Sequence, residues 1–295
     1  MPIEFDSGRV DIGGVDDRRG SRSGGLAVGG GVGLVGLVVT LLFSLLTGNV
    51  PEISGGLGET RSGQGSGESA EELRDRCNSP GALRQHTDCR LIKVYNIADD
   101  VWSAEFARRG LPYESPRLAF FTGSVNTGCG PASAEVGPFY CPPDQEIFFE
   151  LDFLEQLQTR FGARGEFAQA YIVAHEFGHH LQTLTGTERR VRAAQQRNPA
   201  AASEYSVAME LQADCYAGVW STLADRLGEN GIALDTEDIT EAIAAAEAVG
   251  DDRIQAKVSG RVDPESWTHG SAAQRREWFV TGYRSGDLDS CTTVR

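Results

Sequence analysis

The chain contains 295 residues, of which 40% are hydrophobic, and it carries a formal net charge of −15. This hydrophobic fraction is enough for a folded core and excludes a chain that is disordered throughout. The negative charge argues against nucleic acid as a partner, because the surface would repel a phosphate backbone. A chain of this length forms one large domain or two small ones.

The first 72 residues are predicted to lie outside the folded domain. Residues 1–25 are polar and rich in glycine and charge, which is typical of a disordered tail. Residues 26–46 carry no charge and would form a helix of about 31 Å, which matches a hydrocarbon core of about 30 Å. A transmembrane helix is predicted here. A cleaved signal peptide is the alternative, but the apolar run is long for one and no Ala-x-Ala site follows. Residues 47–72 are rich in glycine and serine and predict a flexible linker.

The basic residues predict the orientation of this helix. Arg9, Arg18, Arg19 and Arg22 precede the apolar run, whereas only Arg61 lies within about 20 residues after it. By the positive-inside rule the N-terminus stays cytoplasmic and the rest of the chain is exported. The sequence therefore predicts a single-pass protein of the cell membrane with an extracytoplasmic domain over residues 73–295.

Cysteine usage agrees with export. All six cysteines follow the apolar run, and an even number there is typical of disulfides in an oxidising compartment. Six cysteines allow 15 pairings, so the sequence does not fix the connectivity. Free buried thiols or a cysteine zinc site are the alternatives, although no Cys-x-x-Cys occurs. Pairing of near neighbours would join Cys77 to Cys89 and Cys129 to Cys141, and would leave Cys215 with Cys291.

The folded part is predicted to be α+β, mostly helical with a small sheet. Residues 99–110 predict a short helix with an acidic start and a glycine stop. Glycine, proline and asparagine turns separate three extended runs, which predicts an antiparallel or mixed sheet from residues 117–122, 134–140 and 146–150. Further helices are predicted over 152–161, 167–185, from 189, over 204–227 and 236–249, and from 271.

The predicted helix over 167–185 contains His-Glu-x-x-His. His175 and His179 are four residues apart and share a helix face, so both imidazoles can bind a single metal ion. Imidazole ligands with an open position for water suit zinc, which lowers the pKa of its water to about 7. Glu176, beside the first ligand, is then predicted to take the proton of that water as general base.

A second pair of side chains completes this site. Glu210 and Asp214 are also four residues apart, within the predicted helix over 204–227. Zinc usually has three protein ligands in a catalytic site, so Glu210 is the predicted third ligand. Asp214 is placed to accept a hydrogen bond from the free nitrogen of a ligand histidine. The alternative is two solvated carboxylates, but their neighbours are mostly apolar.

His269 lies just before the last predicted helix, where Ser271 and Gln274 have the spacing of a capping box. One interpretation makes His269 a donor to the oxyanion of a tetrahedral intermediate. The other makes it a structural histidine bonded to a neighbouring loop.

Three blocks, in this order, resemble a bacterial family of neutral zinc metallopeptidases, which are membrane-anchored and zincin-like. They are His175-Glu-Phe-Gly-His179-His, Glu210-Leu-Gln-Ala-Asp214-Cys-Tyr-Ala-Gly and His269-Gly-Ser-Ala-Ala-Gln-Arg-Arg-Glu-Trp-Phe. The resemblance covers about residues 77–291 and the anchor. It implies a zincin-like fold in which His175, His179 and Glu210 bind zinc, Glu176 is the base and Asp214 supports a ligand. It also implies a strand within residues 134–150 that pairs with an extended peptide.

The sequence thus predicts a zinc metallopeptidase (a hydrolase) with Zn²⁺ as cofactor, acting on peptides or proteins outside the membrane. A rival interpretation is a catalytically silent domain that binds peptide or protein partners, but the intact Glu176 argues against it. A di-iron protein would need a second Glu-x-x-His motif on another helix, and the sequence has none.

Overall fold

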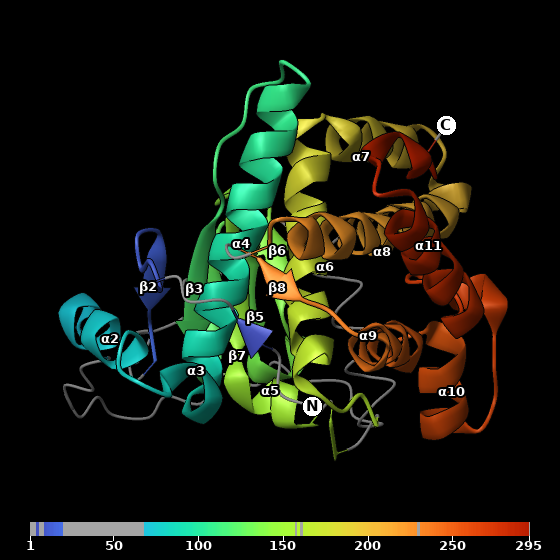
Figure 1. Cartoon of the computed structure of the whole chain (residues 1–295). Coiled ribbons are helices and arrows are strands. Elements are labelled where there is room, and N and C mark those ends of the chain that lie inside the picture. Colours follow the sequence, from blue (N-terminus) through green and yellow to red (C-terminus); the bar gives the residue numbers. More distant parts are fainter. Residues whose placement is uncertain are drawn as a thin grey trace.

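The structure is a computed structural model that describes residues 4–5, 9–19, 68–156, 158–159, 162–228 and 231–294. Helices form most of this part of the chain, as predicted (Figure 1). The helices are α2 Ala70–Cys77, α3 Ala82–Gln85, α4 Thr87–Arg108, α5 Leu151–Gln156, α6 Glu166–Leu184, α7 Thr187–Arg197, α8 Ala202–Arg226, α9 Thr236–Ala248, α10 Asp251–Ser259 and α11 Ala272–Ser285. The strands are β1 Glu4–Phe5, β2 Val15–Asp17, β3 Arg117–Phe121, β4 Ser124–Thr127, β5 Gly130–Ser133, β6 Phe139–Cys141, β7 Glu146–Glu150 and β8 Ile232–Ala233.

The main sheet is mixed and has the strand order β2-β3-β7-β6. β3 runs parallel to both β2 and β7, and β6 pairs with β7 in the antiparallel direction. Successive side chains of a strand point to opposite faces. Phe120 and Phe149 accordingly join the core beneath the helices, whereas Phe121 and Phe148 join a second cluster together with Val125 of the β4–β5 hairpin. Both faces of the sheet are therefore covered.

Helix α6 lies at the centre of the helical layer and packs against α4, α8 and α9, and α11 packs on α8 (Figure 1). Most side chains of α6 are buried, because the sequence of this helix is apolar on nearly every side. Strand β6 also contacts α6, so the sheet lies beside this helix as predicted.

The disulfides follow the predicted pairing. They join Cys77 to Cys89, Cys129 to Cys141 and Cys215 to Cys291. The third bond ties α8 to the segment that follows α11.

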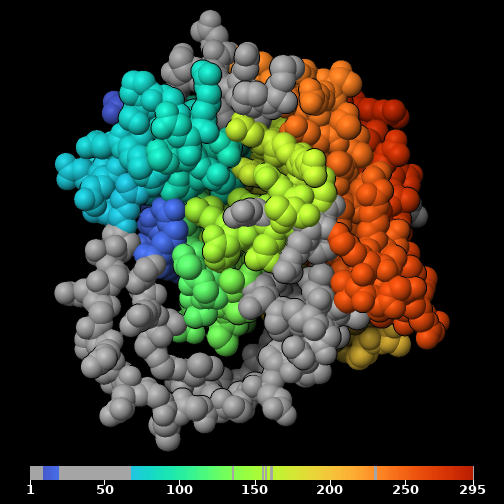
Figure 2. Space-filling view, turned by 90° about the horizontal axis from the view of Figure 1, so that it is seen from below, coloured from blue at the N-terminus to red at the C-terminus, as the bar shows by residue number. Residues whose placement is uncertain are grey.

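The prediction of a disordered cytoplasmic tail is wrong for residues 9–19. Val15–Asp17 pair in parallel with Leu118–Phe120, and the side chains of Val10 and Ile12 are buried. Figure 2 shows these N-terminal residues (blue) set between the cyan helices and the green strands. Arg19 also forms an ion pair with Asp88 of α4 at 2.8 Å.

These contacts correct the predicted topology as well. A single membrane crossing between residues 19 and 68 would place β2 and β3 on opposite sides of a bilayer, although they are neighbours in one sheet. None of the helices in the described ranges is both long and apolar enough to cross a membrane. The single-pass location and the transmembrane helix in the predicted fold are therefore wrong. Residues 26–46 themselves, and most of the predicted linker, lie outside the described residues.

Several element boundaries also differ from prediction, and two of the differences have a clear origin or size. Helix α4 begins at Thr87 instead of residue 99. The run over 134–140 is a strand only from Phe139, because Gly137 at φ 76° ends a 3₁₀ turn over Ala134–Val136.

Candidate metal centre

The three predicted ligands meet at the contact between α6 and α8. His175 Nε2 lies 3.2 Å from one carboxylate oxygen of Glu210, and His179 Nε2 lies 3.5 Å from the other. The two imidazole rings are 4.9 Å apart and perpendicular. One ligand atom from each residue lies within 4.8 Å of the others, so the three side chains can hold a single ion.

A glycine within the motif lets α8 approach this closely. A Cβ on Gly178 would lie 2.8 Å from the Cα of Ala213, which is closer than such atoms come in proteins. Because Gly178 has no side chain, the two helices touch between the histidines and Glu210. The short separation of the ligands depends on this contact.

Asp214 orients His175 through the ring nitrogen that does not face Glu210. The Nδ1 atom of His175 donates to Asp214 Oδ1 at 2.9 Å, so its Nε2 lone pair is left for a metal ion. Asp214 is fully buried and also accepts hydrogen bonds from the Tyr171 hydroxyl and the Arg275 guanidinium. The predicted role of Asp214 therefore fits the geometry.

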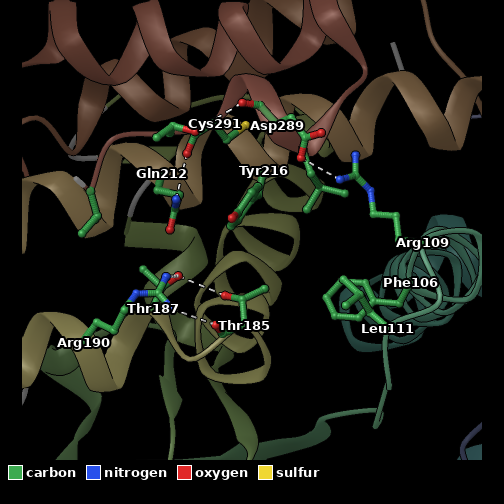
Figure 3. A pocket seen from close by; sticks show the side chains of 13 residues that line it. Phe106, Arg109, Leu111, Thr185, Thr187, Arg190, Gln212, Tyr216, Asp289 and Cys291 are labelled. Carbon is green, nitrogen blue, oxygen red and sulfur yellow. Dashed lines mark hydrogen bonds and ion pairs between the residues drawn. The ribbon is translucent and has the colours of Figure 1, made fainter.

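His179 is oriented by a chain of two glutamines. Its Nδ1 donates to Gln182 Oε1 at 2.9 Å, and Gln182 Nε2 donates to Gln212 Oε1 at 3.2 Å. Gln212 in turn donates to the carbonyl of Cys291 at 2.8 Å, and Figure 3 shows this bond at the wall of a cavity of about 280 Å³. The lining of this cavity includes Gln212 and none of the three ligands, so the cavity is separate from the cluster.

The donor set fits zinc. Both histidines use Nδ1 for a partner and keep Nε2 for the metal, and Glu210 supplies a carboxylate. Burial opposes the charged form of Glu210, but His179, His269 and His175 hold the pKa of this carboxyl well below its usual range. Burial likewise opposes protonation of His175, yet Asp214 and Glu210 raise its pKa to about 9. The cluster therefore favours a positive charge between His175 and Glu210, where a metal ion would replace the proton.

Glu176 lies on the same helix, next to the first ligand, and is buried. Burial raises the pKa of its carboxyl, and Glu210 raises it further, while His179 and His175 lower it. The backbone N–H of Tyr140, on strand β6, also faces Glu176 closely enough to lower this pKa. A divalent ion at the cluster would lower it again. Glu176 thus lies between the ligands and the edge of the sheet.

His269 is held by Asp251 at the start of α10. One oxygen of Asp251 accepts the backbone N–H groups of Thr268, His269 and Gly270, at 2.7, 2.6 and 3.0 Å. The other oxygen lies 3.3 Å from His269 Nδ1. The charge of His269 contributes to the low pKa of Glu210, so its imidazole lies near the cluster. Both interpretations of His269 are compatible with this arrangement, because it is anchored to a loop and also lies close enough to Glu210 to affect its pKa.

Comparison with known proteins adds to this geometry. A sequence profile of the family described as "Putative neutral zinc metallopeptidase" matches residues 7–294. The chain belongs to this family. The match includes the N-terminal strand β2 as well as the metal cluster, so the segment before residue 20 is part of the family's domain.

Similar proteins are known from Mycobacterium tuberculosis and Escherichia coli. The "Uncharacterized protein Rv2575" of Mycobacterium tuberculosis is 47% identical over 226 residues, which is 74% of each chain. The "Uncharacterized protein YpfJ" of Escherichia coli is 38% identical over 296 residues, which is 97% of each chain. No solved structure matches the chain significantly.

The sequence did not point to four residues that support the cluster, namely Tyr171, Gln182, Asp251 and Arg275. Helical spacing carries a signal for the first two, because Tyr171 precedes His175 by four positions and Gln182 follows His179 by three. The other two reach the cluster from α10 and α11, and no local spacing reports that. His180, which follows the second ligand, is buried with Nε2 at 2.7 Å from the carbonyl of Glu114.

Proposed function

We propose that this protein is a zinc-dependent metallopeptidase that hydrolyses peptide bonds. One observation carries the proposal: His175, His179 and Glu210 converge on one point, and Glu176 lies beside them. The family's description suggests the same activity. The zincin-like character of the site rests on this motif and its geometry.

His175, His179 and Glu210 would hold the ion. Zinc in such a site supplies a Lewis acid that activates water and polarises the substrate carbonyl. Asp214 and Gln182 keep the two Nε2 atoms directed at one point, which fixes the ligand geometry before the ion arrives. His179 and Glu210 are only partly buried, so the cluster is open to a substrate on that side.

Glu176 is the general base of the proposed reaction. Its carboxylate accepts the proton of the attacking water and then delivers that proton to the nitrogen of the leaving amine. Attack of the water oxygen forms the new carbon–oxygen bond, and the carbon–nitrogen bond then breaks as the carbonyl double bond re-forms and the amine nitrogen takes the proton. Burial raises the pKa of Glu176, which makes its carboxylate a stronger base for the first transfer, from water.

His269 is the proposed donor to the oxyanion. Its Nδ1 is engaged by Asp251 and by the Thr268 hydroxyl at 3.0 Å, and the ring in its protonated form carries a second proton on Nε2 that it can donate. A donor that is already fixed in place stabilises developing negative charge without reorganising during the reaction.

The proposed substrate is an extended peptide lying along β6. This strand is at the edge of the described sheet and pairs there only with β7. A sheet edge presents unpaired backbone groups that can bind a further strand. The edge lies beside Glu176, because the main chain of Tyr140 faces that carboxyl. The three disulfides favour an oxidising compartment as the place of action.

The test is cleavage of a diverse peptide library by the full chain, produced under oxidising conditions and loaded with zinc. Products are identified by mass spectrometry, and the control is Glu176→Gln, which keeps all three ligands. We expect cleavage by the wild type and none by the variant, although both bind one zinc ion. Folded, zinc-loaded wild type that leaves every peptide intact would refute the proposal and favour a domain that binds peptides without cutting them.

A further inference from the structure

We propose that Arg275 is a positioning residue for the metal centre, which holds Asp214 and through it His175 in the orientation that a ligand needs. The inference deepens the proposed function and rests on the same cluster. Arg275 lies on α11, 100 positions from His175, and no local spacing connects the two.

The contact between Arg275 and Asp214 is a two-point fork. Arg275 Nε donates to Asp214 Oδ2 at 2.8 Å, and Nη2 donates to Oδ1 at 2.9 Å. Two parallel bonds fix the plane of the carboxylate, which a single bond would leave free to rotate. Since Oδ1 of this carboxylate also accepts from His175 Nδ1, the plane of Asp214 sets the direction of the imidazole.

A third side chain ties the same groups together. The Tyr171 hydroxyl donates to Asp214 Oδ1 and accepts from Arg275 Nη2 at 3.2 Å. Tyr171 and His175 are one turn apart on α6. Arg275 is therefore connected to α6 in two ways, directly through Tyr171 and indirectly through Asp214, which accepts from His175. One closed hydrogen-bond network therefore joins the ligand His175 to Asp214, Tyr171 and Arg275.

The burial of this network is costly and sets Arg275 apart from its neighbour on the same helix. Asp214 is 0% exposed and Arg275 is 2% exposed, whereas the side chain of the adjacent Arg276 is 61% exposed. Burying an ion pair contributes little net stability, because desolvation offsets the attraction. A pair placed directly behind a metal ligand is therefore better explained by orientation of that ligand than by stability.

The packing of α11 on α8 fixes Arg275 in place. Glycines meet at this contact, because a Cβ on Gly218 would collide with the carbonyl of Phe279 and one on Gly282 with the carbonyl of Cys215. The helix starts at a capping box in which Ser271 accepts from the backbone N–H of Gln274. Arg275 therefore enters the cluster from a helix that cannot shift without losing both contacts.

The experiment measures zinc affinity by competition with a chelator in the full chain. Arg275→Met removes the fork, Arg275→Lys keeps the charge without the fork, and Arg276→Met is the matched control on the exposed side. We expect a ten- to hundredfold loss of zinc affinity for Arg275→Met, which is typical of removing a partner of a ligand histidine. The lysine variant should recover part of the loss, and Arg276→Met should match the wild type.

A double-mutant cycle tests whether the effect passes through Asp214. Arg275→Met should cost little further zinc affinity once Asp214→Asn is present, because the two substitutions break one connection. A full additional loss in that background would overturn the inference, as would wild-type zinc affinity in Arg275→Met. Should the methionine variant fail to fold, the lysine variant answers the question, since unchanged zinc affinity there would also overturn the fork.

The metal-free protein gives a second readout that separates this inference from the proposed function. The hydrogen-bonded Nδ1–H proton of His175 should be visible by NMR in the wild type and should be lost to exchange in Arg275→Met. Zinc binding without peptide cleavage would refute the peptidase and leave the Arg275 inference intact. A wild type that bound no zinc would refute the metal site, and the NMR signal would still decide the role of Arg275.

Discussion

The metal cluster and the attachment point of the N-terminal strand both bury a carboxylate, but they neutralise it in different ways. Asp88 of α4 lies between Arg19 and Arg76, each at 2.8 Å, and the charge of a guanidinium is permanent. Glu210 faces the imidazoles of His175 and His179, whose charge depends on a proton, while the guanidinium of Arg275 lies farther away, at 3.9 Å.

This difference separates a structural ion pair from a ligand site. The cluster around Asp88 is complete, because its cations are part of the chain. The cluster around Glu210 is complete only when a proton or a metal ion lies among its three side chains. Burial alone therefore does not mark a functional carboxylate, whereas the kind of partner does.

Matched substitutions of the two carboxylates should give the largest contrast. We expect Glu210→Gln to lower zinc affinity by roughly a thousandfold, about 4 kcal/mol, because it removes a ligand instead of a ligand's partner. Asp88→Asn should leave zinc affinity within about twofold of the wild type. Chelator competition measures both, and equal losses in the two variants would show that the clusters are not distinct.

Deletion of residues 1–19 should lower the free energy of unfolding by about 3 kcal/mol. It exposes the contacts of Val10 and Ile12, each worth roughly 1.5–3 kcal/mol when buried, and it leaves Glu146 without Arg18. Urea unfolding measures the loss. The folded truncated protein should still bind zinc with unchanged affinity, and a loss of stability below about 1 kcal/mol would show that the segment is not part of the cooperative unit.

Within the metal centre, the support of His179 can be tested separately from that of His175. Gln182→Met removes the acceptor of His179 Nδ1 and should lower zinc affinity about tenfold, which is about 1.4 kcal/mol. Gln182→Glu keeps an acceptor and should retain more of the affinity. The opposite order of these two variants in a zinc titration would contradict the proposed hydrogen bond.

The smallest predicted effect is the acid sensitivity of the N-terminal attachment. Burial disfavours the ionised Asp88, but Arg76 and Arg19 lower the pKa of this carboxyl to about 2. An unfolded aspartate has a pKa of about 3.9, so this stabilisation is complete above that pH and is lost as the pH falls towards about 2. Urea unfolding of wild type and Asp88→Asn should therefore converge between pH 4 and pH 2, and a constant difference would exclude Asp88 as the group responsible.

Short spacing along the chain is enough to predict several parts of this protein. Side chains four positions apart on a helix share a face whatever the helix packs against, so the sequence alone pairs His175 with His179 and Glu210 with Asp214. The capping box at Ser271 follows from a similarly local pattern, whereas the disulfides agree with near-neighbour pairing although the sequence left the connectivity open.

Which distant residues meet depends instead on how the whole domain packs. Arg275 reaches Asp214, and Gln212 reaches Cys291, through helix contacts that no spacing encodes. Strand β2 has three residues, too few for a periodic signal, and Arg19 beside it fits the pattern of a membrane-orientation signal although it pairs with Asp88. A charge has the same sequence signature whether it faces water, a bilayer or a buried carboxylate, and its partner is fixed only when the chain is packed.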